Sequence, residues 1–479
     1  MANANKEKQN HNPDVIILGV GTSGEDLSHQ LLDAGLEVVG IEPHLVGGSC
    51  PYYACLPSKT MLRAAKTLHE AKLVEEKAGE ADVDPDWSPV AERVRWITGG
   101  WDDSYAMKRY KKHGGHLIKA PGQLTGPRTV AVNGETYTAK RGIVIATGSK
   151  PAIPPIDGIA SVDYWTTRDV IQMSELPESI VVVGGGASGC ELGQVMARFG
   201  VDVTIVEAQD QLLPVEEPEA AQVVEDAFKE EGIRVKTGTR ATKVASKDGG
   251  VTVTLDNGDE LEAEKLFLAA GRTIDLSGLG LESIGIDPDA PFIPVDERMH
   301  VTDGVWAMGD VTGKALFSHV GLYQSEIIAS EITGKDHPPA AYHAIPRGTF
   351  TDPEVGSVGM TEAEARAAGK DPAVVIKSIK GTFRGMVDNV EHGMIKLVAD
   401  PDRGTLIGAS VAGPRAAEML GMLNLAVHNQ IPIKDLQTMM YAFPAFYSAI
   451  GEAIGAYGRG LQIAIDPEYQ GIEVLDKAA

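Results

Sequence analysis

Two cysteines and a lysine are the residues of this sequence whose types and spacing most directly suggest chemistry. Four residues separate Cys50 from Cys55, and Lys59 follows four residues later. On one helix the two thiols would lie slightly more than one turn apart, so a disulfide between them requires a distorted first turn. Pro51 suits the first helical position, which would place Cys50 at a helix N-terminus, where the dipole favours a thiolate. The segment therefore predicts a redox-active pair, with two buried small side chains as the alternative.

The cysteines follow a strand, a glycine turn, a helix and a second strand, an order that predicts a dinucleotide-binding unit. Residues 15–18 and 38–41 are apolar runs typical of buried parallel strands, and residues 25–34 favour a helix. The turn has the spacing G-x-G-x-x-G, with Gly19, Gly21 and Gly24. These glycines permit a tight turn, close approach of a pyrophosphate, and close packing of the helix on the strand. Glu42, after the second strand, is placed to accept from a ribose hydroxyl.

The same pattern recurs in the second part of the chain. Residues 180–183 and 203–206 are apolar runs, and Glu207 ends the second of them. The turn between them again carries three glycines in the same spacing, Gly184, Gly186 and Gly189. Since the acid follows the first glycine by 23 residues in both places, the sequence predicts two dinucleotide sites.

Later segments predict the remaining architecture. Residues 143–148 and 266–271 are each a further apolar strand ending in glycine, and 305–310 is a strand ending in Gly-Asp. From about residue 345, strand-like runs at 374–379, 393–398 and 405–411 mix with a helical stretch at 416–429. The fold class expected is therefore α/β, with two Rossmann-like dinucleotide-binding domains and a C-terminal α+β domain.

Composition excludes several other classes of protein. With 43 Lys and Arg against 67 Asp and Glu, the net charge of −24 argues against a nucleic-acid-binding protein. The absence of any apolar run of about 18 residues argues against a membrane span. Three cysteines in 479 residues are too few for a disulfide scaffold or a four-cysteine zinc site, so we expect no metal site. The polar first residues lack the apolar core of a signal peptide, which predicts a disordered tail at 1–12 and a cytoplasmic protein.

Several motifs, in a consistent order, resemble the FAD-dependent pyridine nucleotide–disulfide oxidoreductases, a family that includes dihydrolipoamide dehydrogenase and mercuric reductase. Residues 47–59 resemble the redox helix of that family, and residues 307–310 its flavin-ribityl motif. Residues 146–149 and 270–272 resemble its two returning strands, and residues 351–362 the opening of its dimer-interface domain. The resemblance covers about residues 13–465.

The resemblance implies a role for each candidate site residue. The first dinucleotide unit would bind FAD, with Asp310 on the ribityl chain, and the second would bind the nicotinamide dinucleotide. Cys55 would face the flavin and Cys50 would attack a substrate, while Lys59 and Glu191 match a pair near the flavin ring. Further cofactor-binding positions are Gly48, Ser49, Thr147, Gly148, Gly271 and Gly309. Because a carboxylate repels a 2′-phosphate, Glu207 favours NADH over NADPH.

One departure from the family bears directly on function. Most members end with His-Pro-x-x-x-Glu, reached from the other subunit, where the histidine takes a proton from the substrate thiol. Here Phe443 stands in place of the histidine and Ser448 in place of the glutamate. Neither side chain does acid–base work near pH 7, which argues against a fast lipoamide or glutathione reductase.

The sequence as a whole predicts a homodimeric flavoenzyme of the disulfide-oxidoreductase class. It would pass electrons from NAD(P)H, with NADH favoured, through FAD to a Cys50–Cys55 disulfide. The small-molecule acceptor would be a disulfide, a quinone-like molecule or another electrophile. Two alternatives remain: a carbon–sulfur-cleaving enzyme like 2-ketopropyl coenzyme M oxidoreductase/carboxylase, which also has Phe at the position of Phe443, and a non-catalytic flavin-binding or redox-sensing subunit. The domain boundaries expected are 13–155 and 276–344 for FAD binding, 156–275 for NAD(P) binding, and 345–479 for the interface domain.

Overall fold

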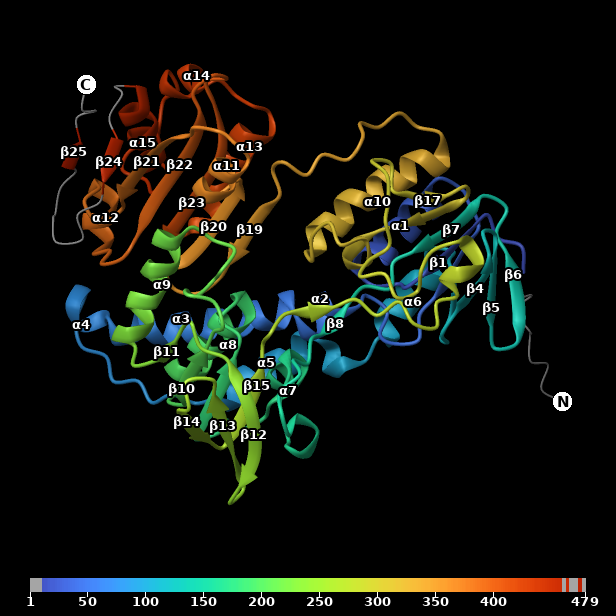
Figure 1. Cartoon of the computed structure of the whole chain (residues 1–479), viewed down its shortest axis with the longest axis horizontal. Helices are drawn as coiled ribbons and strands as arrows, with labels where there is room; N and C mark the ends of the chain where they lie inside the picture. Colours follow the sequence, from blue (N-terminus) through green and yellow to red (C-terminus); the bar gives the residue numbers. More distant parts are fainter. Residues whose placement is uncertain (1–10, 459–461, 465–472, 476–479) are drawn as a thin grey trace. The chain divides into compact units, whose positions relative to one another are not determined.

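The computed structural model describes residues 11–458, 462–464 and 473–475, which form two compact units (Figure 1). The first comprises residues 11–57, Glu92–Ala152 and Arg272–Ala341, and the second comprises Ser58–Ala91, Ile153–Gly271 and the described residues from Tyr342 onward. Residues 1–10 of the expected tail lie outside the described residues. His11 does have partners, since its ring stacks on Tyr137 and its carbonyl accepts from the Thr138 N–H.

The first unit is built on a six-stranded sheet. All neighbouring strands are parallel except the edge pair β17–β18. In spatial order the strands are β17 (His300–Thr302), β18 (Val305–Ala307), β7 (Gly142–Ile145), β1 (Val15–Leu18), β2 (Val38–Ile41) and β3 (His116–Ile118). The short apolar strands β1, β2 and β7 are buried along their whole length, as expected for a parallel sheet covered on both faces.

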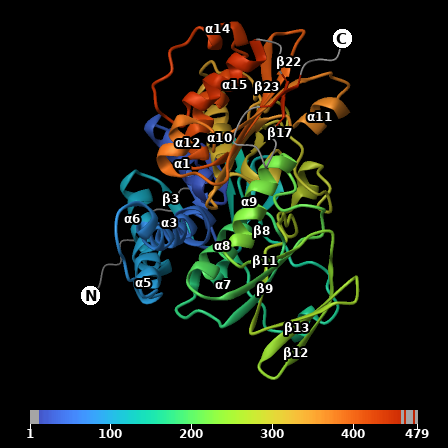
Figure 2. The ribbon, with the colours of Figure 1, turned by 90° about the vertical axis from the view of Figure 1, so that its left-hand side faces the viewer.

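Different layers cover the two faces of this sheet. On one face lie α1 (Thr22–Asp33), α6 (Ser104–Lys112) and α10 (Ser318–Thr333), with α1 and α10 side by side in both views (Figures 1 and 2). The Tyr110 hydroxyl of α6 lies over Gly40 of β2 and donates to Ser28 of α1. On the other face a three-stranded antiparallel sheet contributes Leu124, Val130 and Tyr137 to the core. Its strands are β4 (Gln123–Gly126), β5 (Thr129–Val132) and β6 (Glu135–Thr138).

Smaller elements complete the first unit. Strands β8 (Lys150–Pro151) and β16 (Arg272–Thr273) pair with each other. The redox segment forms α2 (Ser49–Tyr53), and the short 3₁₀ turns are η1 (Gly99–Trp101), η3 (Leu281–Ile284) and η4 (Gly309–Thr312). Two helices begin in one unit and end in the other, α3 (Cys55–Lys72) and α5 (Ser88–Ile97).

The second unit repeats the dinucleotide-binding arrangement. Its four-stranded parallel sheet has the order β11 (Arg234–Lys236), β10 (Asp202–Val206), β9 (Ser179–Val183) and β15 (Lys265–Leu268). The accompanying helices are α4 (Val74–Lys77), α7 (Thr167–Gln172), α8 (Ala187–Arg198) and α9 (Pro218–Glu230), with the 3₁₀ turn η2 (Ile159–Ser161). Three antiparallel strands, β12 (Ala241–Lys247), β13 (Gly250–Leu255) and β14 (Glu260–Ala263), pack on the sheet through an apolar core.

The C-terminal part of the second unit is a five-stranded antiparallel sheet with helices. The sheet order is β19 (Pro346–Thr349), β20 (Glu354–Gly359), β23 (Thr405–Gly413), β22 (Met394–Asp400) and β21 (Ala373–Ser378). Helix α13 (Ala416–His428) packs on β20 and β23, and α15 (Ser448–Gly458) packs on β21 and β22. The remaining elements are α11 (Glu362–Ala367), α12 (Phe383–Asp388), α14 (Ile433–Gln437), β24 (Gln462–Ala464) and β25 (Glu473–Leu475).

The expected fold class is confirmed: the chain is α/β with a C-terminal α+β part. The expected strands at 143–148, 266–271 and 305–310 all end earlier than expected, at Ile145, Leu268 and Ala307, and after the last of them Gly309 begins a 3₁₀ turn. A positive φ of 74° at Gly309 ends the extended backbone there, and Asp310 belongs to the turn that follows. Among the helices of the described residues, none is both long and apolar enough to cross a membrane.

Candidate active site

The helix that carries the cysteines is broken between them. Helix α2 ends at Tyr53, Ala54 has φ −139° and ψ −104°, and α3 starts at Cys55. This break is the distortion that the four-residue spacing requires if the two thiols are to meet. Both cysteines are free thiols; Cys50 is half-buried and Cys55 is exposed. Pro51 lies at the third position of α2 rather than the first, because α2 already begins at Ser49.

The surroundings of Cys50 favour its protonated form, in contrast to the thiolate that a helix N-terminus would favour. Its pKa is raised, first because a hydrogen bond to Cys55 holds the proton on Cys50, and second because the thiol is buried. The nearby Ser318 and Thr22 hydroxyls act in the opposite direction but do not prevail. A helix of one turn supplies little dipole, so the local hydrogen bond dominates. Ser318, whose Oγ also lies 3.6 Å from Cys55 Sγ, therefore has a hydroxyl within reach of both sulfurs.

The glycine turn of the first dinucleotide unit holds the redox segment in place. The Gly47 N–H donates to the Val20 carbonyl at 2.8 Å, and the Thr22 hydroxyl donates to the Gly47 carbonyl at 3.0 Å. Gly48 has φ +71°, and a Cβ there would lie 2.8 Å from the Gly21 Cα. A side chain at Gly48 would push the two loops apart, so this glycine is required by close approach as well as by its backbone angle.

The first glycine turn fits a bound dinucleotide. A Cβ on Gly19 would lie 2.4 Å from the Ala146 carbonyl oxygen, and one on Gly24 would lie 2.1 Å from the Gly19 carbonyl oxygen. Gly21 is the N-cap of α1, and no side chain caps the helix there, so its first N–H groups are available to a phosphate. Glu42 is buried and accepts from the Val20 and His44 N–H groups, which fixes its carboxylate at the end of β2.

Asp310 belongs to a polar cluster with Ser149 and Arg272. The Ser149 hydroxyl donates to the Asp310 carboxylate, and Arg272 Nε donates to Ser149 Oγ at 2.6 Å. Arg272 Nε also lies 3.5 Å from Asp310 Oδ2. The cluster joins residues that follow two strands. Ser149 follows β7, after Thr147 and Gly148, and Asp310 follows β18. These positions were named separately from the sequence, and the structure brings them together with Gly309 at the carboxyl ends of two adjacent parallel strands.

The second glycine turn is closely similar. A Cβ on Gly189 would lie 1.9 Å from the Gly184 carbonyl oxygen, whereas a Cβ on Gly186 would meet no atom within 4 Å. Gly186 is the N-cap of α8, again with no capping side chain. Glu207 is buried and accepts from the Gly185 N–H at 2.6 Å and the Gln209 N–H at 2.8 Å. Gly271 follows the neighbouring strand β15 with φ +100° and open space around it.

Lys59 and Glu191 form an ion pair in the second unit. Lys59 Nζ lies 2.8 Å from Glu191 Oε2, and the two side chains are 37% and 5% exposed. The other carboxylate oxygen accepts from the Phe350 N–H at 2.8 Å, and the Lys59 ammonium lies 4.7 Å from the centre of the Phe350 ring. The resemblance to the family predicted these two charged residues as a pair. It did not predict Phe350, because every residue except proline has a backbone N–H and the residue type therefore does not reveal which one donates.

The loop that carries Phe350 is fixed by residues of α8. Gln194 Nε2 donates to the Asp352 carbonyl at 2.7 Å, and the Asp352 N–H donates to Gln194 Oε1 at 2.8 Å. Arg198 forms an ion pair with the Asp352 carboxylate at 3.1 Å. Helix α8 therefore provides the Glu191 carboxylate and also Gln194 and Arg198, which hold the loop whose Phe350 N–H donates to that carboxylate. Cys190, next to Glu191, is fully buried, and burial raises the pKa of its thiol, in agreement with a packing role.

The segment at 442–448 contains no side chain that could replace the missing acid–base pair. Phe443 is 65% exposed, and its ring contacts Phe383 edge-on at 5.1 Å between centres. The Tyr447 hydroxyl accepts from the Ala442 N–H, and the Ser448 hydroxyl donates to the Ala445 carbonyl. Both hydroxyls are therefore used to fold the segment back on itself, and the exposed side chain at its tip is apolar.

Comparisons with known proteins find a matching family and relatives that align over most of the chain. Residues 13–348 match the family described as pyridine nucleotide-disulphide oxidoreductase, and residues 345–454 match the dimerisation domain of that family. A dihydrolipoyl dehydrogenase of Halobacterium salinarum is 34% identical over 457 residues, which cover 92% of this chain and 95% of the relative. A mercuric reductase of Lysinibacillus sphaericus is 29% identical over 89% of this chain and 79% of the relative.

Solved structures have the same fold over nearly the full length. LpdA from Mycobacterium tuberculosis aligns with a TM-score of 0.83 at 26% identity, covering 92% of this chain and 99% of its own. The HOCl-induced flavoprotein disulfide reductase RclA from Escherichia coli aligns with a TM-score of 0.81 at 25% identity, with the same coverage.

Proposed function

Since the chain belongs to the pyridine nucleotide–disulphide oxidoreductases, we propose that it uses NADH to reduce a quinone-like or other electrophilic acceptor through Cys50 and Cys55. Enzymes of this family are FAD-dependent and use NAD(P)H. The proposal extends this family assignment in three respects: the kind of acceptor, the preference for NADH and the role of each residue.

The observation that carries the proposal is the composition of residues 442–448. In the family this segment supplies a base for thiol–disulfide exchange, and general acid–base catalysis contributes roughly 10²–10⁴-fold. Here the exposed tip is Phe443, and the Ser448 hydroxyl is bonded to Ala445. Exchange with a disulfide acceptor, in which an acid–base group must move protons between the enzyme thiols and the leaving thiolates, is therefore disfavoured.

An acceptor of the quinone type needs no such base. Two thiols carry two protons and two electrons, so a quinone and the dithiol give a hydroquinone and a disulfide with all atoms balanced. The hydrogen bond to Cys55 and burial both raise the pKa of Cys50 and so favour its protonated form. The Ser318 hydroxyl, within reach of both sulfurs, would relay that proton or stabilise the thiolate that remains.

The chain's own residues account for cofactor binding in this proposal. The uncapped N-terminus of α1, Glu42 and Asp310 would hold FAD, and the N-terminus of α8 and Glu207 would hold the nicotinamide dinucleotide. The chemistry that bound FAD would supply there is hydride acceptance from the nicotinamide and transfer of the electron pair to the Cys50–Cys55 disulfide. The domain boundaries 13–155 and 276–344 for FAD, 156–275 for NADH and 345–479 for the interface belong to the same proposal.

Glu207 is the residue proposed to select NADH over NADPH. Its carboxylate is fixed at the end of β10 by two backbone N–H groups, where it would accept from a ribose 2′-hydroxyl and repel a 2′-phosphate. The following residues, Ala208 to Gln211, include no arginine that would bind a phosphate.

A homodimer completes the proposal. The matched dimerisation domain supports it, and in the family the segment equivalent to 442–448 serves the thiols of the other subunit. The tip at Phe443 would then form an apolar wall at the partner's acceptor site.

The experiment is an anaerobic titration of the FAD-loaded protein with NADH and, separately, NADPH. Uptake of about four electrons per chain, two by FAD and two by the disulfide, is expected with NADH. The Cys55→Ala variant should take up about two, while Cys190→Ala, the matched control, should behave as wild type. Equal uptake by Cys55→Ala and wild type would refute the thiol relay.

Acceptor assays then separate the candidate functions. We expect turnover with a water-soluble benzoquinone to exceed turnover with lipoamide by at least about 10²-fold. This factor is the smallest contribution expected from the general acid–base catalysis that the missing His–Glu pair would supply. Fast lipoamide turnover would refute the proposal and favour the activity named for the Halobacterium relative. Specific cleavage of a 2-ketopropyl thioether would favour the carbon–sulfur-cleaving alternative. Reduction of the flavin by NADH without turnover of any acceptor would favour the non-catalytic flavin-binding or redox-sensing subunit.

A further inference from the structure

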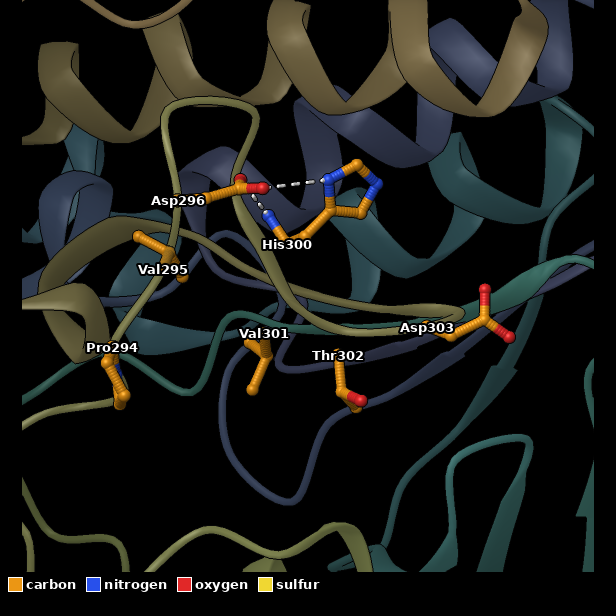
Figure 3. Close-up of a pocket in the computed structure, with 7 residues that line it drawn as sticks. All are labelled: Pro294, Val295, Asp296, His300, Val301, Thr302 and Asp303. Atoms are coloured by element: carbon orange, nitrogen blue, oxygen red, sulfur yellow. Dashed lines mark hydrogen bonds and ion pairs between the residues drawn. The ribbon is translucent and has the colours of Figure 1, made fainter.

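Within the described part of the chain, a hollow on the first unit and a cavity in the C-terminal domain lie apart from the candidate active site and differ in character. A hollow of about 510 Å³ on the first unit is lined by residues 294–303 alone (Figure 3). Its charged groups are already paired: Asp296 accepts from the His300 N–H at 2.8 Å and lies 3.4 Å from the His300 ring nitrogen, and Asp303 lies 3.7 Å from the Arg128 guanidinium. A single strand-and-loop segment with its charges satisfied offers a ligand little to bind.

The second cavity, which we call the α13–β23 cavity, has a volume of about 560 Å³. Its lining comes from several elements of the C-terminal domain: the approach to β19, the end of β20, α11, the start of β23 and the end of α13. Its size falls in the range typical of small-molecule sites, about 300–1,000 Å³.

Part of the lining is apolar and rigid. Leu406 and Val427 are each almost fully buried and belong to the core of the domain. Ile407 and Met360 add further apolar surface, and Met360 is partly exposed at the rim. An apolar group placed against Leu406 and Val427 would be removed from water on a surface that is already held by core packing.

The charged part of the lining is mainly cationic. Arg347, Lys370 and Arg403 line the cavity, against one acidic lining residue, Glu364. Glu364 accepts from the Thr361 N–H as part of a helix cap. In a chain with a net charge of −24, an excess of cations around one cavity runs against the overall charge.

The three cations are not equivalent. Arg347 is paired with Glu216 at 3.1 Å, and Lys370 with Asp400 at 3.0 Å, and both of these carboxylates are buried behind the lining. Arg403 has no carboxylate within 4.0 Å in the described part of the chain. Its guanidinium is therefore the cation available to a ligand, with the fork of donors that suits a carboxylate.

We propose that the α13–β23 cavity binds a monovalent amphipathic anion, with its carboxylate on Arg403 and its apolar body against Leu406 and Val427. None of the lining residues belongs to the thiol site, to the Lys59–Glu191 pair or to either glycine turn. The site is therefore independent of the proposed reaction, and its test does not depend on which acceptor the enzyme reduces.

The test is equilibrium dialysis of ¹⁴C-labelled octanoate against the full-length, FAD-loaded protein. Wild type should bind about one octanoate per chain, and Arg403→Gln should bind it about tenfold more weakly, as expected when a hydrogen bond to a charged group is lost. Arg366→Gln is the matched control, because Arg366 is an exposed arginine on the nearby helix α11 that does not line the cavity. Its affinity should equal that of wild type.

Two further measurements separate the carboxylate from the apolar body. Unlabelled octan-1-ol should compete at least about tenfold less well than unlabelled octanoate, because it cannot pair with Arg403. Met360→Trp, which enlarges a rim side chain into the cavity, should lower the affinity at least about fivefold. The proposal is overturned by absence of saturable binding up to about 10 mM, by an equal loss in Arg366→Gln, or by less than about a threefold loss in Arg403→Gln.

Discussion

The ion pair between Lys59 and Glu191 is partly buried, so the free energy with which the two charges stabilise each other can be measured directly. At 2.8 Å and an effective dielectric constant of about 20, the attraction between the two charges is about 6 kcal/mol. Removal of Glu191 from water opposes this gain, and Lys59, at 37% exposed, is screened by solvent and loses side-chain entropy. We therefore expect a net coupling free energy of about 1–2 kcal/mol, between the values for exposed and buried pairs.

The perturbation is a double-mutant cycle of Lys59→Met, Glu191→Gln and the combined variant. Lys59→Met should be the more damaging single change, because it leaves a buried carboxylate with the Phe350 N–H as its remaining partner. The combined variant should be less destabilised than the sum of the two single variants. At about 2 °C per kcal/mol for a unit of this size, the difference is a thermal midpoint about 2–4 °C higher than additivity predicts.

The assay is thermal unfolding of the FAD-loaded protein, with the rate of flavin reduction by NADH measured on the same samples. An identical cycle on the exposed pair Lys380 and Glu391 serves as control and should give a coupling below about 1 kcal/mol. Additivity of the Lys59 and Glu191 changes within about 0.3 kcal/mol would refute the argument that this pair is held in a partly desolvated site.

Three further predictions follow from other parts of the structure. Lys396, 2% exposed, lies within 3.0 Å of three carboxylates, so Lys396→Met should lower the thermal midpoint by about 6–10 °C near pH 7, from about 3–5 kcal/mol. Burial would raise the pKa of Glu362, but hydrogen bonds, first from Lys396, lower it below 4.5. The stabilising contribution of Glu362 is therefore present above about pH 4.5 and is lost below it. The difference in thermal midpoint between wild type and Lys396→Met should accordingly shrink when unfolding is repeated at about pH 4. Phe443→His combined with Ser448→Glu should raise lipoamide turnover by about 10²-fold, and an unchanged rate in steady-state assays would show that the missing dyad does not limit exchange. Ser318→Ala removes a hydroxyl that favours a thiolate, so alkylation of the reduced cysteine pair by iodoacetamide at about pH 8 should slow several-fold, and an equal rate would argue against this contact.

The dinucleotide-binding elements could be predicted from the sequence because their signals are local. The apolar runs at residues 15–18 and 38–41 coincide with β1 and β2, and the glycine spacing places α1 where the helix was expected, although α1 begins earlier, at Thr22. A buried parallel strand needs a continuous apolar run, and a turn packed against a carbonyl needs glycine, so both requirements are visible in residue type. The pairing of Lys59 with Glu191 was likewise within reach of the sequence, through its resemblance to a known family.

Only the tertiary structure decided the electrostatics of the thiols and the partners of the charged residues. The sequence placed Cys50 at a helix N-terminus and favoured a thiolate, but the break at Ala54 brings Cys55 close enough to hold the proton on Cys50. Ser318 and the Phe350 N–H come from segments far away in the sequence, and the cavity at Arg403 is formed by several elements of one domain. Hydrogen bonds, burial and unpaired charge depend on distances of a few ångströms between such segments, and residue order does not encode those distances locally.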